Sequence, residues 1–319
     1  MAVTLPESAK LSQDELQRSV VEMFVLESSV LDRIPLLSVE GNNYAYNEEA
    51  TLPGVKFRDA NEAFGDETGT VNQRTEKLVI LGGDADVDRF IVQTRGNLMD
   101  QRAIQTRLKV KAATLAFQDA FINGDTAVNA KSFDGLKKRL TGPQVITAAP
   151  NGMPIIGGSA NEQHAFFDKL DEVVNAVVGD VGALYMNKAI RAKIMSAGRR
   201  TGGTDWITVL FGDNPTMSKR IPTYNGIPML DIGTRADGSS IIGLNETQGT
   251  ASNASSIYAV SWAGDESNPG VAGLTNGGVQ VRDLGEIAEK PVYRTRIEFY
   301  CGLGVFGKGA ARLAGVLNN

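Results

Sequence analysis

Cysteine and histidine are almost absent from this chain: Cys301 and His164 are the only residues of their kinds among 319. A single cysteine excludes an intrachain disulfide framework and a multi-cysteine zinc site, and it fits assembly in a reducing compartment. A single histidine excludes histidine-rich metal sites and makes any Ser-His-Asp triad depend on one side chain. We interpret His164, which lies in a segment of helical periodicity, as an ordinary helix residue.

Long apolar runs and a basic charge are also missing. No stretch approaches the roughly 18 apolar residues that a membrane-spanning helix needs, so no span is expected. The first ten residues lack the basic and apolar regions of a signal peptide. The net charge of -5 argues against a dedicated nucleic-acid binder, which is normally basic.

The sequence contains no Walker A motif, no H-E-x-x-H and no G-x-S-x-G. Gly302-Leu303-Gly304-Val305-Phe306-Gly307 matches G-x-G-x-x-G, but the 12 residues after it leave no room for the helix, second strand and acid of a dinucleotide fold. Asp84-Ala85-Asp86-Val87-Asp88 opens like a calcium loop, yet Arg89 and Arg95 stand where such a loop needs Gly and Glu. We therefore predict a tight glycine-rich turn and a solvated acidic turn, with no catalytic, cofactor or metal site.

The N-terminal third predicts a helix followed by an extended segment. Ser12-Gln13-Asp14-Glu15 is a capping box, and apolar residues at helical spacing follow it, so we expect a helix over 13–32 that Pro35 ends. Residues 41–82 instead combine alternating tyrosines, a polar centre and the strand-like run Leu78-Val79-Ile80-Leu81, closed by two glycines. Such a two-stranded arm is marginal alone in water and needs a surface to lie on.

The rest of the chain reads as one long helix, an α/β block and a final strand. Apolar residues at helical spacing over 94–123, stopped by Gly124, predict a helix of roughly 45 Å. Further helices are expected over 161–178 and from Asn187 to about Arg199, with a glycine-rich loop after the second. Strands are expected at 183–186, after the Asn225-Gly226 turn, at 240–244, at 257–262 and over 292–303.

The order of these parts resembles the capsid fold of tailed bacteriophages named after phage Hong Kong 97. The stretches that carry the resemblance are Phe121-Ile122-Asn123-Gly124-Asp125, Phe133-Asp134-Gly135-Leu136, Leu184-Tyr185-Met186-Asn187, Tyr224-Asn225-Gly226-Ile227-Pro228, Ile257-Tyr258-Ala259-Val260 and the tail from Val279 to Gly304. The resemblance covers nearly the whole chain, and the order of the motifs is more specific than any one of them.

The resemblance implies an α+β fold with four parts. These are an N-arm (1–40), an extended loop (41–82), a peripheral domain with a long spine helix (83–145 and 290–319) and an α/β axial domain (146–289). It also implies the function of a major capsid protein, which self-assembles through pentamers and hexamers into an icosahedral shell enclosing double-stranded DNA. Such a protein has no enzymatic activity and belongs to the virion, with assembly in the host cytoplasm.

Two departures from the family pattern bear on the partners. Some members carry an N-terminal scaffolding segment of about a hundred residues; here the spine helix begins near residue 94, so a separate scaffolding protein is expected, beside a portal. Some members crosslink a loop lysine to a neighbour's asparagine. Lys56 and Lys77 lie in the corresponding segment, but no acceptor can be matched.

Charge suggests where the arm would bind a neighbouring subunit. Residues 47–77 hold seven acids and four bases, whereas the spine segment 94–123 holds five bases and two acids. Complementary charge sets register and partner choice. The predicted contacts between subunits are Glu62, Asp66 and Glu67 of the arm with Arg102, Arg107, Lys109 and Lys111 of the spine.

Three alternatives stay open. An encapsulin-like nanocompartment protein would share the fold and store enzymes. An α/β enzyme with an unrecognised site would show a bound small molecule, and a portal or minor capsid protein would form a ring of about twelve copies.

Overall fold

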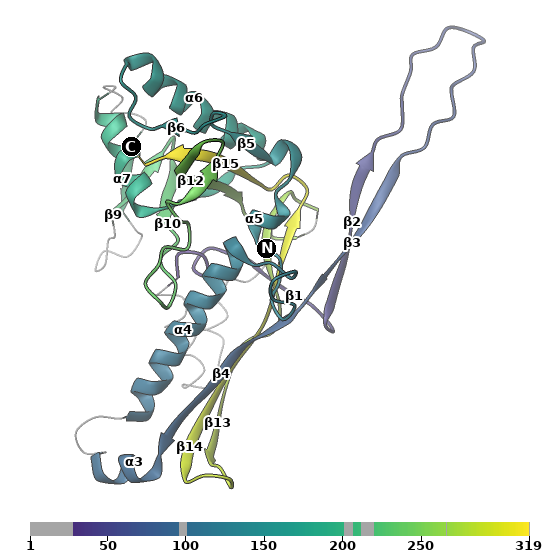
Figure 1. Ribbon diagram of the computed structural model, residues 1–319. Coiled ribbons are helices and arrows are strands. Elements are labelled where there is room, and N and C mark those ends of the chain that lie inside the picture. The colour runs from purple at the N-terminus through teal and green to yellow at the C-terminus, as the bar shows by residue number, and fades with distance from the viewer. Residues whose placement is uncertain (1–27, 96–100, 201–206, 212–219, 266, 319) are drawn as a thin grey trace.

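The chain forms a lobe, a rod and a projecting arm (Figure 1). The computed structural model describes residues 28–95, 101–200, 207–211, 220–265 and 267–318. The lobe holds most of the short strands and two helices, the rod holds the longest strands beside one long helix, and the arm leaves the body near their junction.

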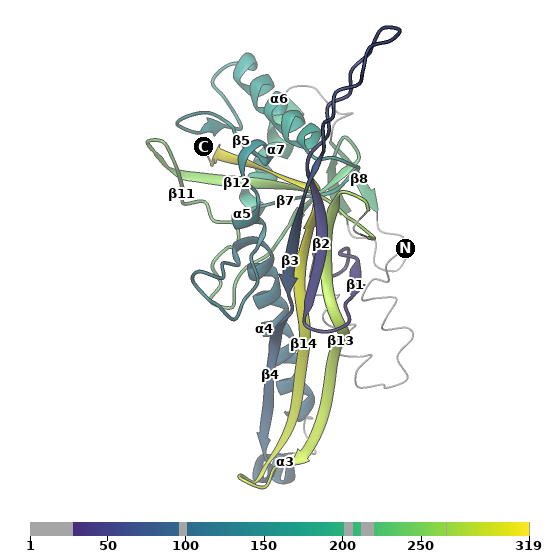
Figure 2. The same ribbon diagram turned by 90° about the vertical axis from the view of Figure 1, so that its right-hand side faces the viewer.

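The rod is a four-stranded sheet with a helix along one face (Figure 2). In order across the sheet, its strands are β1 (Leu36–Ser38), β13 (Gly270–Glu286), β14 (Val292–Phe306) and β4 (Val79–Asp88). β1 pairs in parallel and the others pair antiparallel. Helix α4 (Gln101–Asn123) packs on β4 and β14, and the short α3 (Arg89–Arg95) follows β4.

The lobe contains a nine-stranded sheet. Its strands are β5 (Val145–Thr147), β6 (Met153–Pro154), β7 (Val181–Met186), β8 (Ile207–Phe211), β9 (Arg220–Tyr224), β10 (Ile227–Asp231), β11 (Glu246–Gln248), β12 (Ala251–Ser261) and β15 (Ala310–Leu317). Helices α6 (Ala160–Ala176) and α7 (Lys188–Arg200) contribute to the apolar core on one face. The short α5 (Leu136–Arg139) and the 3-10 turn η1 (Gly142–Gln144) connect rod and lobe.

Local sequence signals explain several boundaries in the lobe. The hydroxyl of Ser159 accepts a hydrogen bond from the Glu162 amide and caps α6, and the side chain of Asn187 accepts one from the Ala189 amide at the start of α7. Asn225 and Gly226 both have positive φ, as a two-residue hairpin turn requires, and they join β9 to β10.

The two parts of the body share a core. Along β7, Leu184 and Met186 are buried under the lobe helices, while Tyr185 faces the other way into the core built around the end of α4. In the rod, the Phe117 ring of α4 lies 5.7 Å from the Phe299 ring of β14, and both are buried. This continuous core fixes the rod against the lobe.

The arm has a paired lower part and an unpaired tip. β2 (Asn43–Thr51) and β3 (Thr70–Lys77) form an isolated antiparallel ribbon, whose register runs from Asn43 opposite Lys77 to Thr51 opposite Thr70. Residues 52–69 continue beyond it without ladder pairing, and all are exposed. The ribbon belongs to neither larger sheet.

Most of the predicted elements are confirmed. α4 matches the predicted long helix over 101–123, with residues 94 and 95 in α3 instead, and residues 96–100 lie outside the described part. The predicted helix over 13–32 lies largely outside the described residues. Its end, 28–32, is a hydrogen-bonded turn, because the Ser28 hydroxyl accepts from the Val30 and Leu31 amides.

The prediction that Gly82-Gly83 ends a strand is wrong. β4 continues through both glycines to Asp88, and a Cβ at Gly82 would lie 2.1 Å from the Ile297 carbonyl oxygen. The glycine permits close approach of β14. The predicted solvated acidic turn at Asp84 to Asp88 is wrong for the same reason, since these residues lie in β4.

Residues 240–244 do not form the predicted strand. Ile241 and Ile242 are both buried, so the segment lacks the alternation of a strand. Side-chain amides satisfy its backbone instead: Asn123 donates to the Ile241 carbonyl at 2.9 Å and Asn187 to the Ile242 carbonyl at 2.7 Å. The loop after α7 lies largely outside the described residues.

The last three strands of the chain are divided between the rod and the lobe. β13 pairs with β14 and so lies in the rod sheet, whereas β15 pairs with β12 in the lobe. The boundaries drawn from the sequence at 82, 145 and 289 stay a prediction. None of the described helices is long and apolar enough to cross a membrane.

Cys301 is buried in the rod core, where burial raises the pKa of its thiol to about 12. We expect no reaction with a thiol reagent at pH 8 in the native protein, because only the thiolate is nucleophilic. Labelling monitored by mass spectrometry across a denaturant series should follow unfolding. Complete labelling of native protein would contradict the buried position.

Candidate assembly interface

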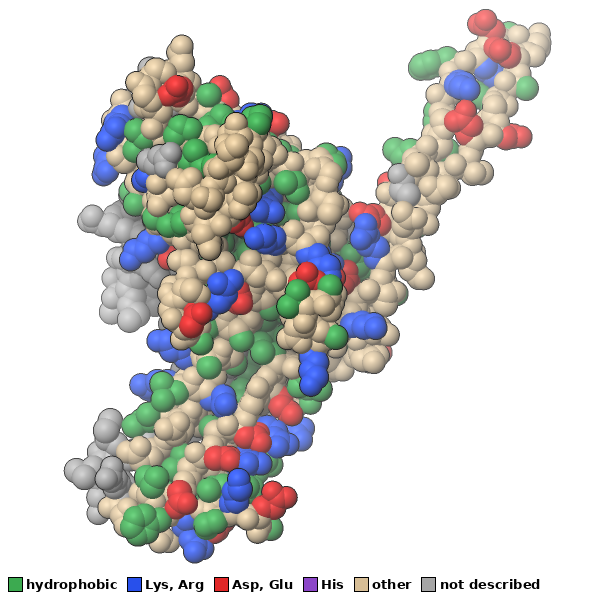
Figure 3. Space-filling model, viewed as in Figure 1, with side chains coloured by type: hydrophobic (Ala, Val, Ile, Leu, Met, Phe, Trp, Pro, Cys, Tyr) green, Lys and Arg blue, Asp and Glu red, His purple; other side chains and the backbone are tan. Residues whose placement is uncertain are grey.

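The tip of the arm exposes apolar side chains that no other described residue of the same subunit covers. Phe57 is fully exposed and Val55 is 92% exposed, and Leu52 and Phe64 are also exposed. Figure 3 shows the arm standing clear of the body. A folded monomer rarely presents such a group of apolar residues on a long projection, and exposed apolar patches mark surfaces that bind another protein.

The three acids predicted to make contacts between subunits lie in this tip. Glu62, Asp66 and Glu67 are exposed. The Glu62 carboxylate accepts from the Asp59 amide at 3.2 Å, and Glu67 lies 3.2 Å from the ammonium of Lys56. Exposed pairs of this kind contribute little to stability, so these carboxylates remain available to a partner.

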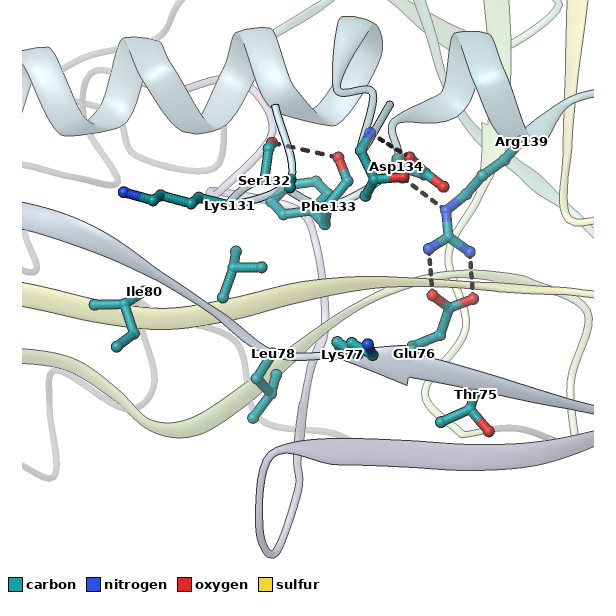
Figure 4. A pocket seen from close by; sticks show the side chains of 13 residues that line it. Thr75, Glu76, Lys77, Leu78, Ile80, Lys131, Ser132, Phe133, Asp134 and Arg139 are labelled. Atoms are coloured by element: carbon teal, nitrogen blue, oxygen red, sulfur yellow. Dashed lines mark hydrogen bonds and ion pairs between the residues drawn. The ribbon is translucent and has the colours of Figure 1, made fainter. Parts of the chain in front are cut away.

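The base of the arm is fastened by a half-buried ion pair (Figure 4). Arg139 donates two hydrogen bonds from its guanidinium to the carboxylate of Glu76 in β3. Only 15% and 13% of these two side chains are exposed. The Arg139 Nε also donates to the Asp134 carbonyl at 2.7 Å, so the guanidinium is fixed on both edges. The pair joins the arm to α5, which follows the loop after α4.

Tyr46 holds β2, the other strand of the arm, against the rod sheet. Its hydroxyl lies 3.1 Å from the Val305 carbonyl oxygen and 3.4 Å from Glu76, and its ring packs edge-on against Phe306 at 4.9 Å. Burial, with a smaller contribution from the Glu76 charge, raises the pKa of Tyr46 to about 12. The neutral hydroxyl can thus donate at all physiological pH values.

The four predicted spine bases divide into two pairs. Arg102 donates to Asp283 of β13 at 2.7 Å and lies over the Tyr293 ring, and Lys109 lies against Gly83 of β4. Arg107 and Lys111 are exposed. The structure thus brings Arg102 and Lys109 to the subunit's own sheet, and none of the four to the arm acids of the same subunit. The predicted pairing between subunits stays a prediction.

The rod sheet carries ion pairs that sequence reasoning missed. Arg296 binds Asp84 and Arg294 binds Asp86, each through two hydrogen bonds of 2.6 to 2.9 Å. Hydrogen bonding to Arg296 lowers the pKa of Asp84, and Lys109 adds a smaller effect. Asp84 and Asp86 are two residues apart in the sequence, and so are Arg294 and Arg296. This matched spacing of acids and bases could have predicted that the two strands are neighbours.

A groove of about 630 Å³ lies between the base of the arm and the loop after α4 (Figure 4). Its lining residues are Thr75, Glu76, Lys77, Leu78, Val79, Ile80, Thr126, Ala130, Lys131, Ser132, Phe133, Asp134 and Arg139. No group of three or more potential metal-ligating side chains occurs among the described residues, here or elsewhere. The lining mixes apolar residues with polar and charged ones.

The subunit thus combines a lobe, a rod with a spine helix, and an arm whose tip is exposed. Known proteins resemble it in both sequence and structure. Residues 12–166 match the family model described as Major capsid protein GP7. A search of curated proteins finds no match.

Solved structures with the same fold are capsid and encapsulin shells. The holo-SrpI encapsulin complex from Synechococcus elongatus PCC 7942 is 18% identical, with a TM-score of 0.64 over 100% of this chain and 98% of that one. The capsid of a native GTA particle is 15% identical, with a TM-score of 0.61 over 91% and 90%. Mycobacterium phage Bobi gives 16% identity and a TM-score of 0.58 over 90% and 89%.

The α+β Hong Kong 97 type fold predicted from the sequence is therefore confirmed, and so is the resemblance to phage major capsid proteins. The chain has the fold of capsid and encapsulin shell subunits. The match over residues 12–166 and the shared fold support a function as a major capsid protein.

Proposed function

We propose that copies of this chain assemble through pentamers and hexamers into a closed icosahedral shell around double-stranded DNA. The observation that carries the proposal is the arm. Its tip exposes Phe57 and Val55 almost completely, while its base is fastened by Glu76 and Arg139. A projection that is fixed at one end and uncovered at the other is suited to bind a second copy.

The proposed contents are held without sequence-specific contacts. The net charge is -5, so the subunit as a whole would not bind duplex DNA tightly. A shell that weakly repels its contents allows DNA to be packaged and later released. The proposed partners are further copies of the chain, a separate scaffolding protein and a portal, with assembly in the host cytoplasm and no enzymatic activity.

Electron microscopy of the expressed chain, with and without a candidate scaffolding protein, tests this function. We expect closed, uniform shells when the scaffold is present, and irregular or open assemblies without it. Analytical ultracentrifugation gives the mass of the particles. A compact monomer under every condition, with the scaffold supplied, contradicts the proposal.

The encapsulin alternative has a specific observation in its favour, because the SrpI structure covers 100% of this chain. The two functions predict different behaviour. A nanocompartment protein should close uniform shells alone and copurify with a cargo protein, which mass spectrometry would identify. A ring of about twelve copies would instead indicate a portal, and a monomer with a bound small molecule would indicate an enzyme.

Reversing the charge of Glu62, Asp66 and Glu67 to lysine tests the predicted pairing of arm and spine. We expect a lower yield of particles and a changed salt dependence, because complementary charges across an interface guide association. The melting temperature of the monomer should not change, since all three residues are exposed. Reversal of Arg107 and Lys111 in the same protein should restore assembly. Unchanged yield and salt tolerance would show that the pairing does not exist.

A further inference from the structure

A bulge in the long strand β13 carries an Asn-Gly pair. The pairing of β13 with β14 stops after Thr275 and resumes at Val279, so the residues between them, Asn276, Gly277 and Gly278, lie outside the ladder. Both glycines have positive φ, and a Cβ added to Gly278 would meet nothing within 4 Å. Asn276 and Gly277 are exposed. The pair therefore lies in an open, water-accessible segment of an otherwise regular sheet.

The side chain of Asn276 contacts the linker through which the chain enters the arm. Its amide nitrogen donates to the Gly41 carbonyl, between β1 and β2, at 3.3 Å. Backbone bonds of 2.8 and 2.9 Å, made by the Val39 amide and to the linker by the Leu78 amide, hold the same segment. The Asn276 bond is longer than the usual range of roughly 2.7–3.2 Å. The side-chain amide is thus only weakly held.

Asn-Gly is the pair in which a backbone nitrogen attacks a side-chain amide most readily. Glycine has no side chain to obstruct the approach, and it allows the backbone to rotate into the reactive geometry. At Asn276 the pair lies outside the ladder, the amide is exposed to water, and its hydrogen bond is long. These conditions favour reaction between the Gly277 nitrogen and the Asn276 side chain.

Two of the other three Asn-Gly pairs in the sequence lack these conditions. In Asn123-Gly124 the glycine amide donates to the Ala120 carbonyl at 2.9 Å, and in Asn151-Gly152 it donates to the Ala149 carbonyl at 3.0 Å. The nitrogen that would attack is engaged in both pairs. The Asn123 side chain also donates two hydrogen bonds of 2.8 and 2.9 Å, which hold its amide in place.

The remaining pair, Asn225-Gly226, is exposed but clamped. It forms the two-residue turn between β9 and β10, and Tyr224 pairs with Ile227 directly on either side of it. A turn closed by ladder pairing restricts the rotation that the attack requires. The four pairs thus offer one open site, one clamped site and two protected sites within the same chain.

We propose that Asn276 is a site of self-modification, at which the chain converts asparagine to aspartate and isoaspartate. The Gly277 backbone nitrogen loses its proton to water and attacks Cγ of Asn276. The new N–Cγ bond closes a cyclic imide, while the Cγ–Nδ2 bond breaks and ammonia leaves with a proton from water. Water then opens the imide, and cleavage of N–Cγ gives aspartate whereas cleavage of the original peptide bond gives isoaspartate. The reaction consumes water and needs no oxidant or cofactor.

Either product alters the entrance of the arm. A carboxylate at position 276 has no proton to donate to the Gly41 carbonyl, and it places a negative charge beside that oxygen. Isoaspartate also lengthens the backbone, which the open bulge accommodates without disturbing the ladder on either side. The modification therefore loosens the linker and leaves the rod sheet intact.

Peptide mass spectrometry of the purified full-length chain, incubated at neutral and at mildly alkaline pH, tests the chemistry. We expect position 276 to gain about 1 Da and its peptide to separate into two chromatographic forms. The rate should rise with pH, because the attacking nitrogen must lose a proton. Asn123 and Asn151 in the same sample should keep their amides. An Asn276 amide that survives as long as those two overturns the proposal.

Hydrogen exchange at the Val39 and Leu78 amides tests the consequence. Both should exchange faster in aged wild-type protein and in N276D than in fresh wild type. N276Q is the matched control, since its side chain would have to close a larger ring, so aged and fresh N276Q should exchange alike. Exchange that is unchanged in both N276D and the aged protein overturns the loosening of the linker. Neither measurement depends on shell assembly, so failure to form shells leaves this inference untouched.

Discussion

Replacement of residues 52–69 by Asn-Gly should give a folded subunit that no longer assembles. Thr51 and Thr70 face each other at the end of the ribbon, and Asn-Gly is the preferred two-residue turn between antiparallel strands. The removed residues are all exposed, so the melting temperature should stay close to the wild-type value. We expect the yield of closed particles to fall by roughly a hundredfold or more, because each subunit loses the segment that completes its neighbour.

A second variant separates the length of the arm from its chemistry. Glycine and serine in place of the same 18 residues keep the length and remove the apolar and acidic side chains. If the side chains provide the binding energy, this variant should fail as fully as the deletion. Electron microscopy and sedimentation measure the particles, and circular dichroism verifies the fold. Wild-type shell yield from the Asn-Gly variant would show that the arm is dispensable.

The arm could be predicted from the sequence because its composition differs from that of its surroundings. Polar residues without helical periodicity, between two strand-like runs, indicated an extended pair of strands with a poor core. The exposed apolar residues of its tip were not singled out. Leu52, Val55, Phe57 and Phe64 form no regular pattern, and only the structure shows that they lie uncovered by the part of the subunit that it describes.

The rod shows where sequence reasoning fails, and the reason is physical. β13 contains Gly277 and Gly278 at positive φ, where its register against β14 shifts. This bulge interrupts the alternation by which a strand is recognised in a sequence. Contacts such as that of Arg102 with Asp283 join residues separated by 181 positions. Their pairing depends on the register of strands, which charge counts within one segment cannot reveal.

Among the polar contacts of the arm, the Glu76–Arg139 pair should lower the free energy of unfolding most when it is broken. In R139Q, the Glu76 carboxylate would remain in a site where only 13% of its side chain is exposed, without the guanidinium that now binds both oxygens. Loss of one partner of a buried ion pair typically costs about 3–5 kcal/mol, and we expect roughly 3 kcal/mol here because the site is not fully closed. Urea unfolding measures this difference.

A double-mutant cycle isolates the pair itself. E76Q combined with R139Q leaves two neutral amides that can bond to each other, so the double variant should be more stable than the sum of the single losses predicts. The surface pair of Lys56 and Glu67 is the matched control, since K56Q should cost less than about 1 kcal/mol. If R139Q costs no more than K56Q, the base of the arm is not fastened by this contact.

Loosening the base should also change assembly in a way that differs from removal of the tip. Tyr46 and Phe306 still hold the other strand in R139Q, so the arm stays attached but samples more directions. The tip then reaches its neighbour less often, and shells should form more slowly and with mixed sizes, whereas the Asn-Gly variant forms none. Hydrogen exchange at β2 and β3 should quicken in R139Q and not in K56Q. Unchanged exchange together with uniform shells would mean that Tyr46 and the ribbon alone set the direction of the arm.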